Sequence, residues 1–238
     1  MMDLEIIYQD EYLIAINKPH GLLVHRSSIA RNAQTFALQE LRNKINRKVF
    51  PIHRLDRKTA GCLLFALDEN TLKSMQQFFA EGKIKKTYLA IVRGYTDQSG
   101  TINYPLENEN RKIQDAITQY KTLAHAEISI PFGKHSTSRY SLVKIFPLTG
   151  RMHQIRKHFA HIIHPIIGDR PHGCNKQNKL FKEKWQMTTM MLHASGIEFL
   201  HPVSNEQIEI SANPSTEFLR MMGVMKWDYS ELMGLQVK

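Results

Sequence analysis

The segment HRLDRKTAG, residues 53–61, places one carboxylate, Asp56, among three cations directly before an apolar run. A solvated basic loop has little need of the carboxylate, and a core strand rarely tolerates the charges, whereas an active-site strand edge can use both. A carboxylate beside arginine remains ionised at neutral pH and can form covalent intermediates with sugars or electrophilic bases. The competing interpretation is a loop aspartate that hydrogen-bonds its own backbone.

A second candidate is LTGRMHQIRKH, residues 148–158. Its apolar spacing predicts a helix that turns Ile155 and Phe159 toward a core. His153 and Arg156 would then share a face, and Arg156 could pair bidentately with a carboxylate from elsewhere in the chain. An ordinary basic helix face at the surface is the alternative.

The third candidate is KKTYLAIVRG, residues 85–94, which is typical of a strand. Tyr88 would lie on one face, with Leu89 and Ile91 on the other. Its ring could stack on a base and its hydroxyl could act locally, although a tyrosine in a strand is more often packed in the core.

Other kinds of site are weakly supported. Four histidines lie close together in the sequence: His153, His158, His161 and His164. Their spacing does not match that of a zincin metal site, and the nearest acidic residue is Asp169. Cys62 lies inside an apolar run and is predicted to be buried and inert. The glycines are isolated, so no phosphate-binding glycine loop is indicated.

The composition indicates an anionic partner. The chain has 238 residues, 42% of them hydrophobic, and a net charge of +10. That charge favours nucleic acid first and a membrane surface second, while a generally basic protein is the plain alternative. Two cysteines, an acidic N-terminus without signal-peptide features and the lack of a long apolar stretch predict a soluble cytoplasmic protein.

Strands and helices are interleaved without a regular βαβ repeat, which predicts an α+β domain on a largely antiparallel sheet. We expect a hairpin over 4–17 and a loop or insert over 107–117. The further expected strands are 62–67, 87–92, 138–146 and 196–200, and the expected helices are 35–45, 72–79, a segment after 150, and 215–222.

Taken together, the three motifs resemble those of the RluA-type pseudouridine synthases. HPIIGD at 164–169, YQDEYLIAINKPHGLLVH at 8–25 and MLHASGIEFLHP at 191–202 are similar to further motifs of that family, in the family's order. The resemblance covers residues 4–212. It implies a mixed, mostly antiparallel sheet in two halves with a central basic cleft. It also implies a single catalytic domain over 1–238, without an N-terminal S4-like domain and with a C-terminal tail at 226–238.

The resemblance assigns roles to individual residues. Asp56 matches the catalytic aspartate, Tyr88 the aromatic residue that stacks on the flipped base, and Arg156 the arginine that pairs with the aspartate. Arg54 matches the residue that fills the gap left in the RNA, and Leu192 an apolar wall of the pocket. The further residues expected to contact RNA are Arg57, His153, Ile155, Arg151, Lys86 and Lys157, together with Arg26, Arg31, Lys83 and Lys85 as phosphate contacts. Ala60 departs from the family, which usually has Ser there.

The implied function is isomerisation of a uridine in RNA, without cofactor, metal or membrane, by a monomer. Within the family, VHRS at 24–27 and the middle insert are most similar to the branch that modifies the T-stem uridine at position 65 of tRNA. Ribosomal RNA is the alternative substrate. Two rival functions are an inactive RNA-binding protein and a nucleoside or glycoside hydrolase, which commonly requires a second carboxylate.

Overall fold

The computed structural model describes residues 3–25 and 35–234, and the chain divides into two compact units. Unit 1 runs to Thr87 and also contains His193–Pro214, and unit 2 contains Tyr88–Leu192 and the residues from Ser215 onward. The chain passes from one unit to the other inside two strands, β5 (Lys85–Arg93) and β11 (Leu192–Leu200).

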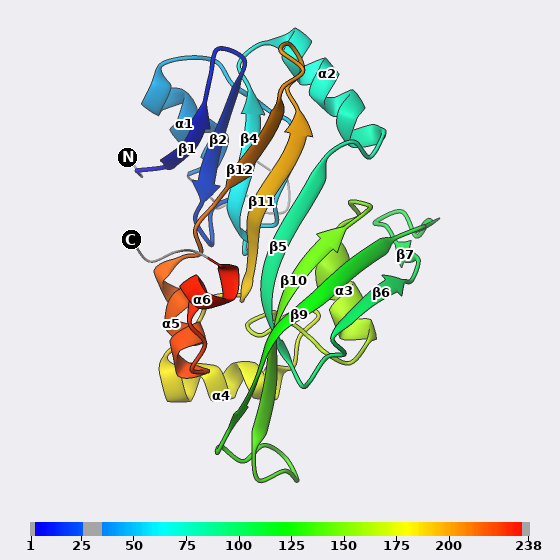
Figure 1. Ribbon diagram of the computed structural model, residues 1–238, viewed down its shortest axis with the longest axis vertical. Coiled ribbons are helices and arrows are strands. Elements are labelled where there is room, and N and C mark those ends of the chain that lie inside the picture. Colours follow the sequence, from blue (N-terminus) through cyan, green and yellow to red (C-terminus); the bar gives the residue numbers. More distant parts are fainter. Residues whose placement is uncertain (1–2, 26–34, 235–238) are drawn as a thin grey trace. The chain divides into compact units, whose positions relative to one another are not determined.

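Unit 1 is built on a mixed sheet (Figure 1). The hairpin of β1 (Glu5–Gln9) and β2 (Leu13–Lys18) pairs through β2 with β4 (Ala60–Ala66), and both pairings are antiparallel. The start of β4 pairs in parallel with β11, while its end pairs with the short β3 (Phe50–Pro51). β12 (Gln207–Ser211) completes the sheet by an antiparallel pairing with β11. All seven residues of β4 are buried, as expected of a central strand.

Alternate residues of β2 and β4 form the apolar core of unit 1 with helix α2 (Glu69–Ala80). Leu13 and Leu64 of these strands belong to the same buried cluster as Met75 of the helix. Asp68 caps α2, because its Oδ1 accepts hydrogen bonds from the backbone N–H groups of Asn70 and Thr71, each at 2.9 Å. A shorter helix, α1 (Ala37–Ile45), precedes β3 in the same unit.

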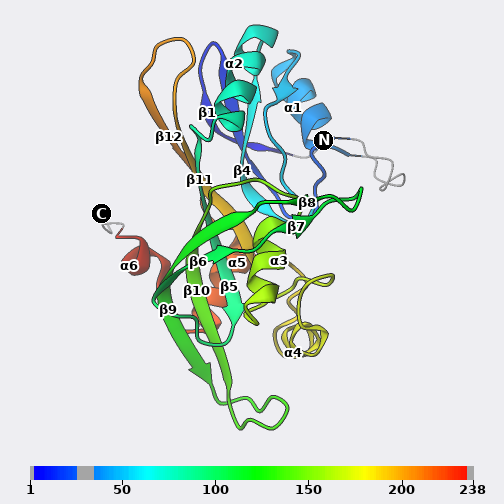
Figure 2. The same cartoon turned by 90° about the vertical axis from the view of Figure 1, so that its right-hand side faces the viewer.

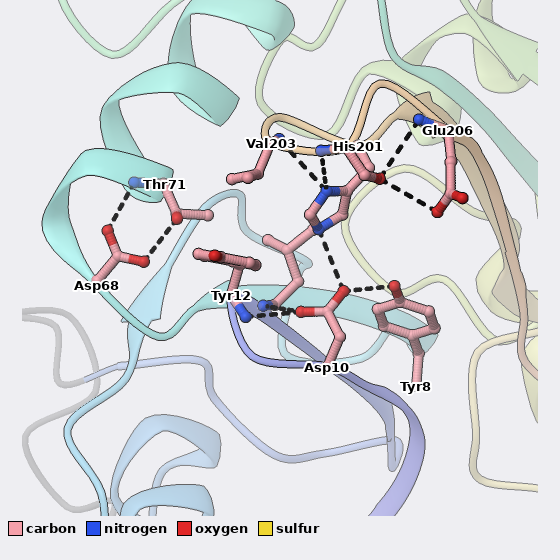
Figure 3. Close-up of polar contacts among 10 residues, drawn as sticks. Tyr8, Asp10, Tyr12, Asp68, Thr71, His201, Val203 and Glu206 are labelled. Atoms are coloured by element: carbon pink, nitrogen blue, oxygen red, sulfur yellow. Dashed lines mark hydrogen bonds and ion pairs between the residues drawn. The ribbon is translucent and has the colours of Figure 1, made fainter.

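The β1–β2 turn is tied to the β11–β12 turn by Asp10 (Figure 3). One carboxylate oxygen of Asp10 accepts from the backbone N–H groups of Tyr12 and Leu13, both at 2.7 Å. The other accepts from the Tyr8 hydroxyl at 2.5 Å and lies 3.2 Å from Nε2 of His201. These contacts fix the register of the first hairpin.

Gly61, the last residue of the opening motif, is required by close packing. Its φ is +111°, and a Cβ there would lie 2.2 Å from the backbone oxygen of Ala194. Ala194 is the β11 residue opposite Gly61 in the parallel pairing. Only glycine lets β4 begin at this point, directly after the Asp56 loop.

Unit 2 contains an antiparallel sheet in the order β5, β10 (Ser138–Pro147), β9 (Ile117–Ile128), β6 (Ser99–Asn103). β9 and β10 form the longest hairpin, with a register shift between Leu142 and Val143 (Figure 2). Two further short strands, β7 (Leu106–Glu107) and β8 (Ile113–Gln114), form a separate small hairpin.

Each face of the unit 2 sheet is covered by helices. Ala90 and Val92 of β5 belong to a buried cluster with Phe159 of α3 (Gln154–His161). Leu89 and Ile91 belong to the opposite cluster, which is completed by α4 (Asn175–Trp185) and α5 (Thr216–Val224). The alternation expected for the strand containing Tyr88 is therefore confirmed.

Residues 225–233, which follow α5, are packed into the core of unit 2. Trp227 is buried in the same cluster as Met221 and Met222, and its indole N–H donates to the backbone oxygen of His125 at 3.2 Å. A last short helix, α6 (Tyr229–Met233), follows.

The fold class predicted from the sequence is confirmed, with most strand pairings antiparallel and helices interleaved among them. The segment 107–117, which was expected to be a loop or insert, contains part of a short hairpin, because β7 and β8 pair there. The burial of Cys62 is confirmed, and it raises the pKa of the thiol to about 12. Within the described part of the chain, no helix combines the length and apolar character needed to cross a membrane.

The close approach at Gly61 predicts a large effect of a single methyl group. We expect Gly61→Ala to lower the free energy of unfolding by at least about 3 kcal/mol, because it adds a clash with the backbone to a strained φ. Gly82→Ala is the matched control, since Gly82 has a φ of +69° and open space around a Cβ, so only the strain of about 1 kcal/mol applies. Equal losses in urea denaturation would contradict the packing argument.

Candidate active site

Asp56 lies in unit 1 in the loop between β3 and β4, and its side chain is half-buried. Its backbone oxygen accepts from the N–H of Thr59 at 3.0 Å, which closes a tight turn. The preceding Leu55 is buried, whereas Arg54 is exposed. Leu55 therefore anchors the loop, with the cation of Arg54 before it and the carboxylate of Asp56 after it.

Lys18, at the end of β2, is the residue that holds this loop in place. Its side chain is fully buried, and its ammonium group donates to the backbone oxygens of Pro19, Leu22 and Arg57 at 3.0, 2.9 and 3.3 Å. Burial lowers the pKa of Lys18 to about 7, and the negative charge of Asp56 opposes that shift. In the sequence, this lysine is only one residue of the motif at 8–25, with no role assigned to it.

Two further hydrogen bonds join the loop after β2 to the loop of Asp56. The backbone N–H of Gly21 donates to the backbone oxygen of Arg57 at 2.8 Å, and Nε of Arg57 donates to the backbone oxygen of Gly21 at 2.9 Å. Nearby, burial first and then the positive charges of Lys18, Lys58 and Arg57 lower the pKa of His20 to about 4. The surroundings of Asp56 within unit 1 are thus strongly positive.

His53, the first residue of the motif, has a structural role. Its Nε2 accepts from the backbone N–H of Leu64 at 3.1 Å, and its ring stacks on Phe79 with 5.2 Å between centroids. Burial, together with the charge of Lys86, lowers the pKa of His53 to about 4, so the ring is neutral at pH 7. The contacts attach the Asp56 loop to β4 and α2.

Arg156 lies in unit 2 on α3 and is buried, with 5% of its side chain exposed. Its Nε and Nη2 donate to the two carboxylate oxygens of Asp169 at 2.7 and 2.8 Å. Asp169 is itself 1% exposed. A bidentate pair of this kind fixes the plane of the guanidinium through one of its edges. The alternative of a surface helix face is wrong for Arg156.

The turn that carries Asp169 is held by α4. Asn178 donates to the backbone oxygen of Asp169 at 2.6 Å and accepts from the N–H of Gly168 at 2.8 Å. Gly168 has a φ of +81°, and a Cβ there would lie 2.0 Å from the backbone oxygen of Thr189. Gly168 of the motif HPIIGD is therefore explained by the tight turn, and Asp169 by its role as the buried counter-ion of Arg156.

The chain enters α3 through a polar network around Gln154. Its amide oxygen accepts from Thr149 Oγ1 at 2.7 Å and from the Arg151 N–H at 3.0 Å, and its amide nitrogen donates to Thr118 Oγ1 at 2.9 Å. His153 precedes the helix with a φ of +56°, and its Nδ1 lies 2.9 Å from Nε2 of His172. His153 is therefore outside the regular helix and does not share a helical face with Arg156.

Three apolar or aromatic candidates pack together in unit 2. Ile155 and Leu192 are buried in the cluster that contains Phe159, and Tyr88 is half-buried against it. Tyr88 thus packs at the edge of this cluster and is only partly buried.

The basic candidates differ in how freely they can reach a ligand. The side chain of Arg151 is exposed, and its Nε donates to the backbone oxygen of Asp115 at 3.0 Å. Lys157 donates to the backbone oxygen of Glu107 at 3.1 Å, and burial lowers the pKa of the half-buried Lys86. Lys85 and Lys83 form exposed ion pairs with Glu198 and Glu81. Arg26 and Arg31 lie outside the described residues.

The four successive histidines make separate contacts with the protein. His158 lies 2.9 Å from both Thr118 Oγ1 and the backbone oxygen of Tyr104, and His161 stacks on the Tyr104 ring. His164 Nδ1 lies 2.8 Å from the backbone oxygen of Arg93. Each histidine is accounted for by packing or by a hydrogen bond.

Comparisons with known proteins agree with these motifs. Residues 12–161, more than half of the chain, match the family model described as RNA pseudouridylate synthase. The chain belongs to this family. The predicted resemblance to RluA-type pseudouridine synthases is thereby confirmed, and the matched stretch contains Asp56, Tyr88 and Arg156.

Two curated relatives cover almost the whole chain. The tRNA pseudouridine synthase C of Vibrio parahaemolyticus is 43% identical over 238 residues, which are 95% of this chain and 97% of the relative. The tRNA pseudouridine synthase C of Haemophilus influenzae is 41% identical over 236 residues, 94% and 99% of the two chains. The solved structure of human RNA pseudouridylate synthase domain containing 4 has a TM-score of 0.72 at 22% identity, covers 93% of each chain, and supports the fold alone.

The electrostatic coupling of Lys18 to Asp56 predicts a pH-dependent stability. Lysine in the unfolded chain titrates near pH 10.5 and Lys18 in the folded protein near pH 7, so between these values the unfolded state binds more protons and stability rises with pH. Asp56→Asn removes the charge that opposes the shift and lowers the pKa of Lys18 further. We expect the stability advantage of the wild type over this variant to be larger at pH 6 than at pH 9 by about 1 kcal/mol.

Urea denaturation at the two pH values measures this difference. Glu11→Gln is the control, because Glu11 is an exposed carboxylate of the same unit outside the Asp56 loop. Its effect should be the same at pH 6 and pH 9. An Asp56→Asn effect that does not change with pH would refute the coupling.

The buried pair of Arg156 and Asp169 predicts strong coupling in a double-mutant cycle. Arg156→Ala and Asp169→Ala should each cost about 3 to 5 kcal/mol, because each leaves the other charge buried without its partner. The double variant should cost far less than the sum, with a coupling energy of at least about 2 kcal/mol. The exposed pair Arg220–Glu217, which is also held by two hydrogen bonds, is the control and should couple by less than about 1 kcal/mol. Additive losses at the buried pair would contradict this interpretation.

Proposed function

We propose that this chain isomerises a uridine of tRNA to pseudouridine in the cytoplasm, acting as a monomer, with Asp56 as the nucleophile and the T-stem uridine at position 65 as its target. The observation that carries the proposal is an aspartate in a half-buried loop that a buried lysine holds in place, in a chain of this family. The nucleophile, the target RNA and the position are all parts of the proposal.

The chemistry requires a fixed, ionised carboxylate. Isomerisation breaks the bond between ribose C1′ and N1 of the base, rotates the base, and joins C1′ to C5. The Asp56 carboxylate adds to the target nucleotide, at C1′ or at the base, and leaves again when the C1′–C5 bond is complete. The proton on C5 is lost and N1 gains one, so the reaction is a redox-neutral rearrangement.

The other residues have supporting roles in this proposal. Arg156, whose guanidinium plane is fixed by Asp169, is the arginine that pairs with the catalytic aspartate in this proposal. Tyr88 stacks on the displaced base and helps to remove the C5 proton. Leu192 provides an apolar wall for the base.

The target base must first leave its stack, at a cost of a few kcal/mol. Arg54 is exposed beside Asp56 and can offset part of this cost by stacking and hydrogen bonding in the vacated space. Arg57, Arg151, Lys86 and Lys157 then supply contacts to the surrounding RNA, with His153 and Ile155 near the entrance to α3. The net charge of +10 favours such contacts.

The relatives support tRNA as the substrate class. Those that cover almost the whole chain at 41–43% identity are named tRNA pseudouridine synthase C. A ribosomal RNA substrate would use the same chemistry, and the choice of RNA is therefore part of the test.

The proposal predicts that Asp56→Asn abolishes turnover and preserves RNA binding. With tRNA transcripts tritiated at C5 of uridine, we expect tritium release to fall by at least about 10³-fold, because the nucleophile is lost. The tRNA dissociation constant should change by less than about threefold. Asp97→Asn, which changes an exposed aspartate of unit 2, is the control and should retain full activity.

Matched substrates separate the alternatives. A transcript with cytidine in place of uridine at position 65 should release no tritium in this assay, and a ribosomal RNA transcript should be a poor substrate. Full activity of Asp56→Asn would refute the nucleophile assignment. Free uracil as the product would instead favour a hydrolase.

A further inference from the structure

A polar pocket lies in unit 2, and none of the residues assigned to the reaction lines it. Its volume is about 420 Å³, within the range of pockets that hold small ligands. It is formed by the end of β5, the loop that joins β9 to β10, and Gln177 of α4. Arg93 of this pocket and Tyr88 are five residues apart on one strand, which corresponds to about 17 Å.

The pocket carries more positive than negative charge. Arg93, Lys134 and Arg139 line it together with a single carboxylate, Glu127. That carboxylate is already engaged by Thr137 at 2.5 Å, by the Tyr95 hydroxyl at 3.1 Å and by Nε of Arg139 at 3.3 Å. Arg139 is therefore largely neutralised, and Arg93 and Lys134 remain to attract an anion.

Arg93 and Lys134 have no carboxylate within ion-pair distance among residues 3–25 and 35–234. The Arg93 guanidinium lies over the ring of Phe132, 5.7 Å from its centroid. Phe132 is half-buried and also lines the pocket. An arginine and an aromatic ring in this arrangement present both charge and flat apolar surface.

Gln177 adds a directional donor to the pocket lining. It is 2% exposed, and its amide oxygen accepts from the hydroxyl of the buried Tyr140 at 2.7 Å. That hydrogen bond uses the oxygen and leaves the two N–H groups of the amide to donate. Among the described residues, none accepts a hydrogen bond from this nitrogen.

The loop that forms the outer wall is a closed turn. Phe132 and His135 exchange both backbone hydrogen bonds, at 2.9 and 3.2 Å, with Gly133 and Lys134 between them. Ser138 Oγ donates to the backbone oxygen of Ile130 at 2.9 Å, which closes the base of the loop. Lys134 is therefore carried at the tip of an ordered hairpin rather than on an open coil.

We propose that this pocket binds a nucleotide of the substrate RNA, with its phosphate on Arg93 and Lys134 and its base against Phe132 and the Gln177 amide. Unpaired nucleotides are recognised by this combination of cations, an aromatic wall and an amide donor. The pocket thus acts as an anchoring site about 17 Å along β5 from Tyr88. This inference rests on the proposed action on RNA and concerns binding, not chemistry.

The test compares tRNA binding by the wild type and by the double variant Arg93→Met, Lys134→Glu. We expect the dissociation constant at about 0.1 M salt to rise at least tenfold, and the slope of log K against log salt to fall by about 1 to 2 as one or two phosphate contacts are lost. Turnover at saturating tRNA should stay within about twofold of the wild type. Phe132→Ala should weaken binding without changing the salt slope.

Lys182→Glu is the matched control, because Lys182 is an exposed lysine on α4 outside the pocket. It should change the dissociation constant by less than about twofold. An unchanged dissociation constant and salt slope in the double variant, with a wild type that binds and converts tRNA, would overturn the pocket proposal. A wild type that neither binds nor converts any RNA would instead overturn the proposed function.

A thermal-shift experiment with two small ligands identifies the chemical class that the pocket binds. Uridine monophosphate should raise the melting temperature of the wild type more than that of the double variant, whereas an oligoglutamate peptide should have no such effect. Selective stabilisation by the peptide alone would overturn the assignment to RNA in favour of an acidic protein partner.

Discussion

The buried ammonium group of Lys18 is the constraint on which the Asp56 side of the site depends. A buried lysine is costly unless its charge is compensated, and here three backbone oxygens and the nearby carboxylate compensate it. Two of those oxygens belong to the loop after β2 and one to Arg57, directly beside Asp56. The interaction therefore joins two irregular segments into one rigid surface. One backbone hydrogen bond from Gly21 to Arg57 and one from the Arg57 side chain to Gly21 complete it.

A second buried charge organises unit 2 in a similar way. Arg156 and Asp169 are 13 residues apart, on α3 and in the turn after it, and each is almost inaccessible to water. A pair of this kind contributes little net stability relative to an apolar pair, but its geometry is highly restrictive. In the proposed reaction its value lies in that restriction, because an arginine already fixed by one carboxylate loses little conformational entropy when it takes part in binding.

The sequence predicted most of the scaffold because the apolar patterns there are strong. The run at 62–67 and the alternation at 87–92 have only one reasonable interpretation, and both are strands. α4 was missed because only Gln177 and Phe181 of its eleven residues are buried, so its apolar stripe is too narrow to detect. β9 was missed because Thr118 and Thr122 occupy buried positions where a strand pattern would normally show apolar residues.

The candidate site was also predicted only in part, because a sequence shows local motifs but not contacts between residues far apart in the chain. The motif residues were recognised from local sequence, whereas the partners of the buried charges were not. Asp169 was considered only as a weak metal ligand, and its pairing with Arg156 depends on the course of the chain through a glycine turn. No role was predicted for Lys18, because sequence alone does not show that three backbone oxygens converge on its ammonium group.

The distribution of cations explains why a net charge of +10 is a poor guide by itself. Lys18 and Arg156 are buried and compensated, and they add nothing to an external field that could attract RNA. Arg139, Lys85 and Lys83 are exposed but paired with carboxylates. Attraction of an anionic ligand must therefore come from the smaller set of accessible cations without a local counter-ion. Among these, Arg93 and Lys134 line a pocket with an aromatic wall, so their positive charges can attract an anion to one defined place.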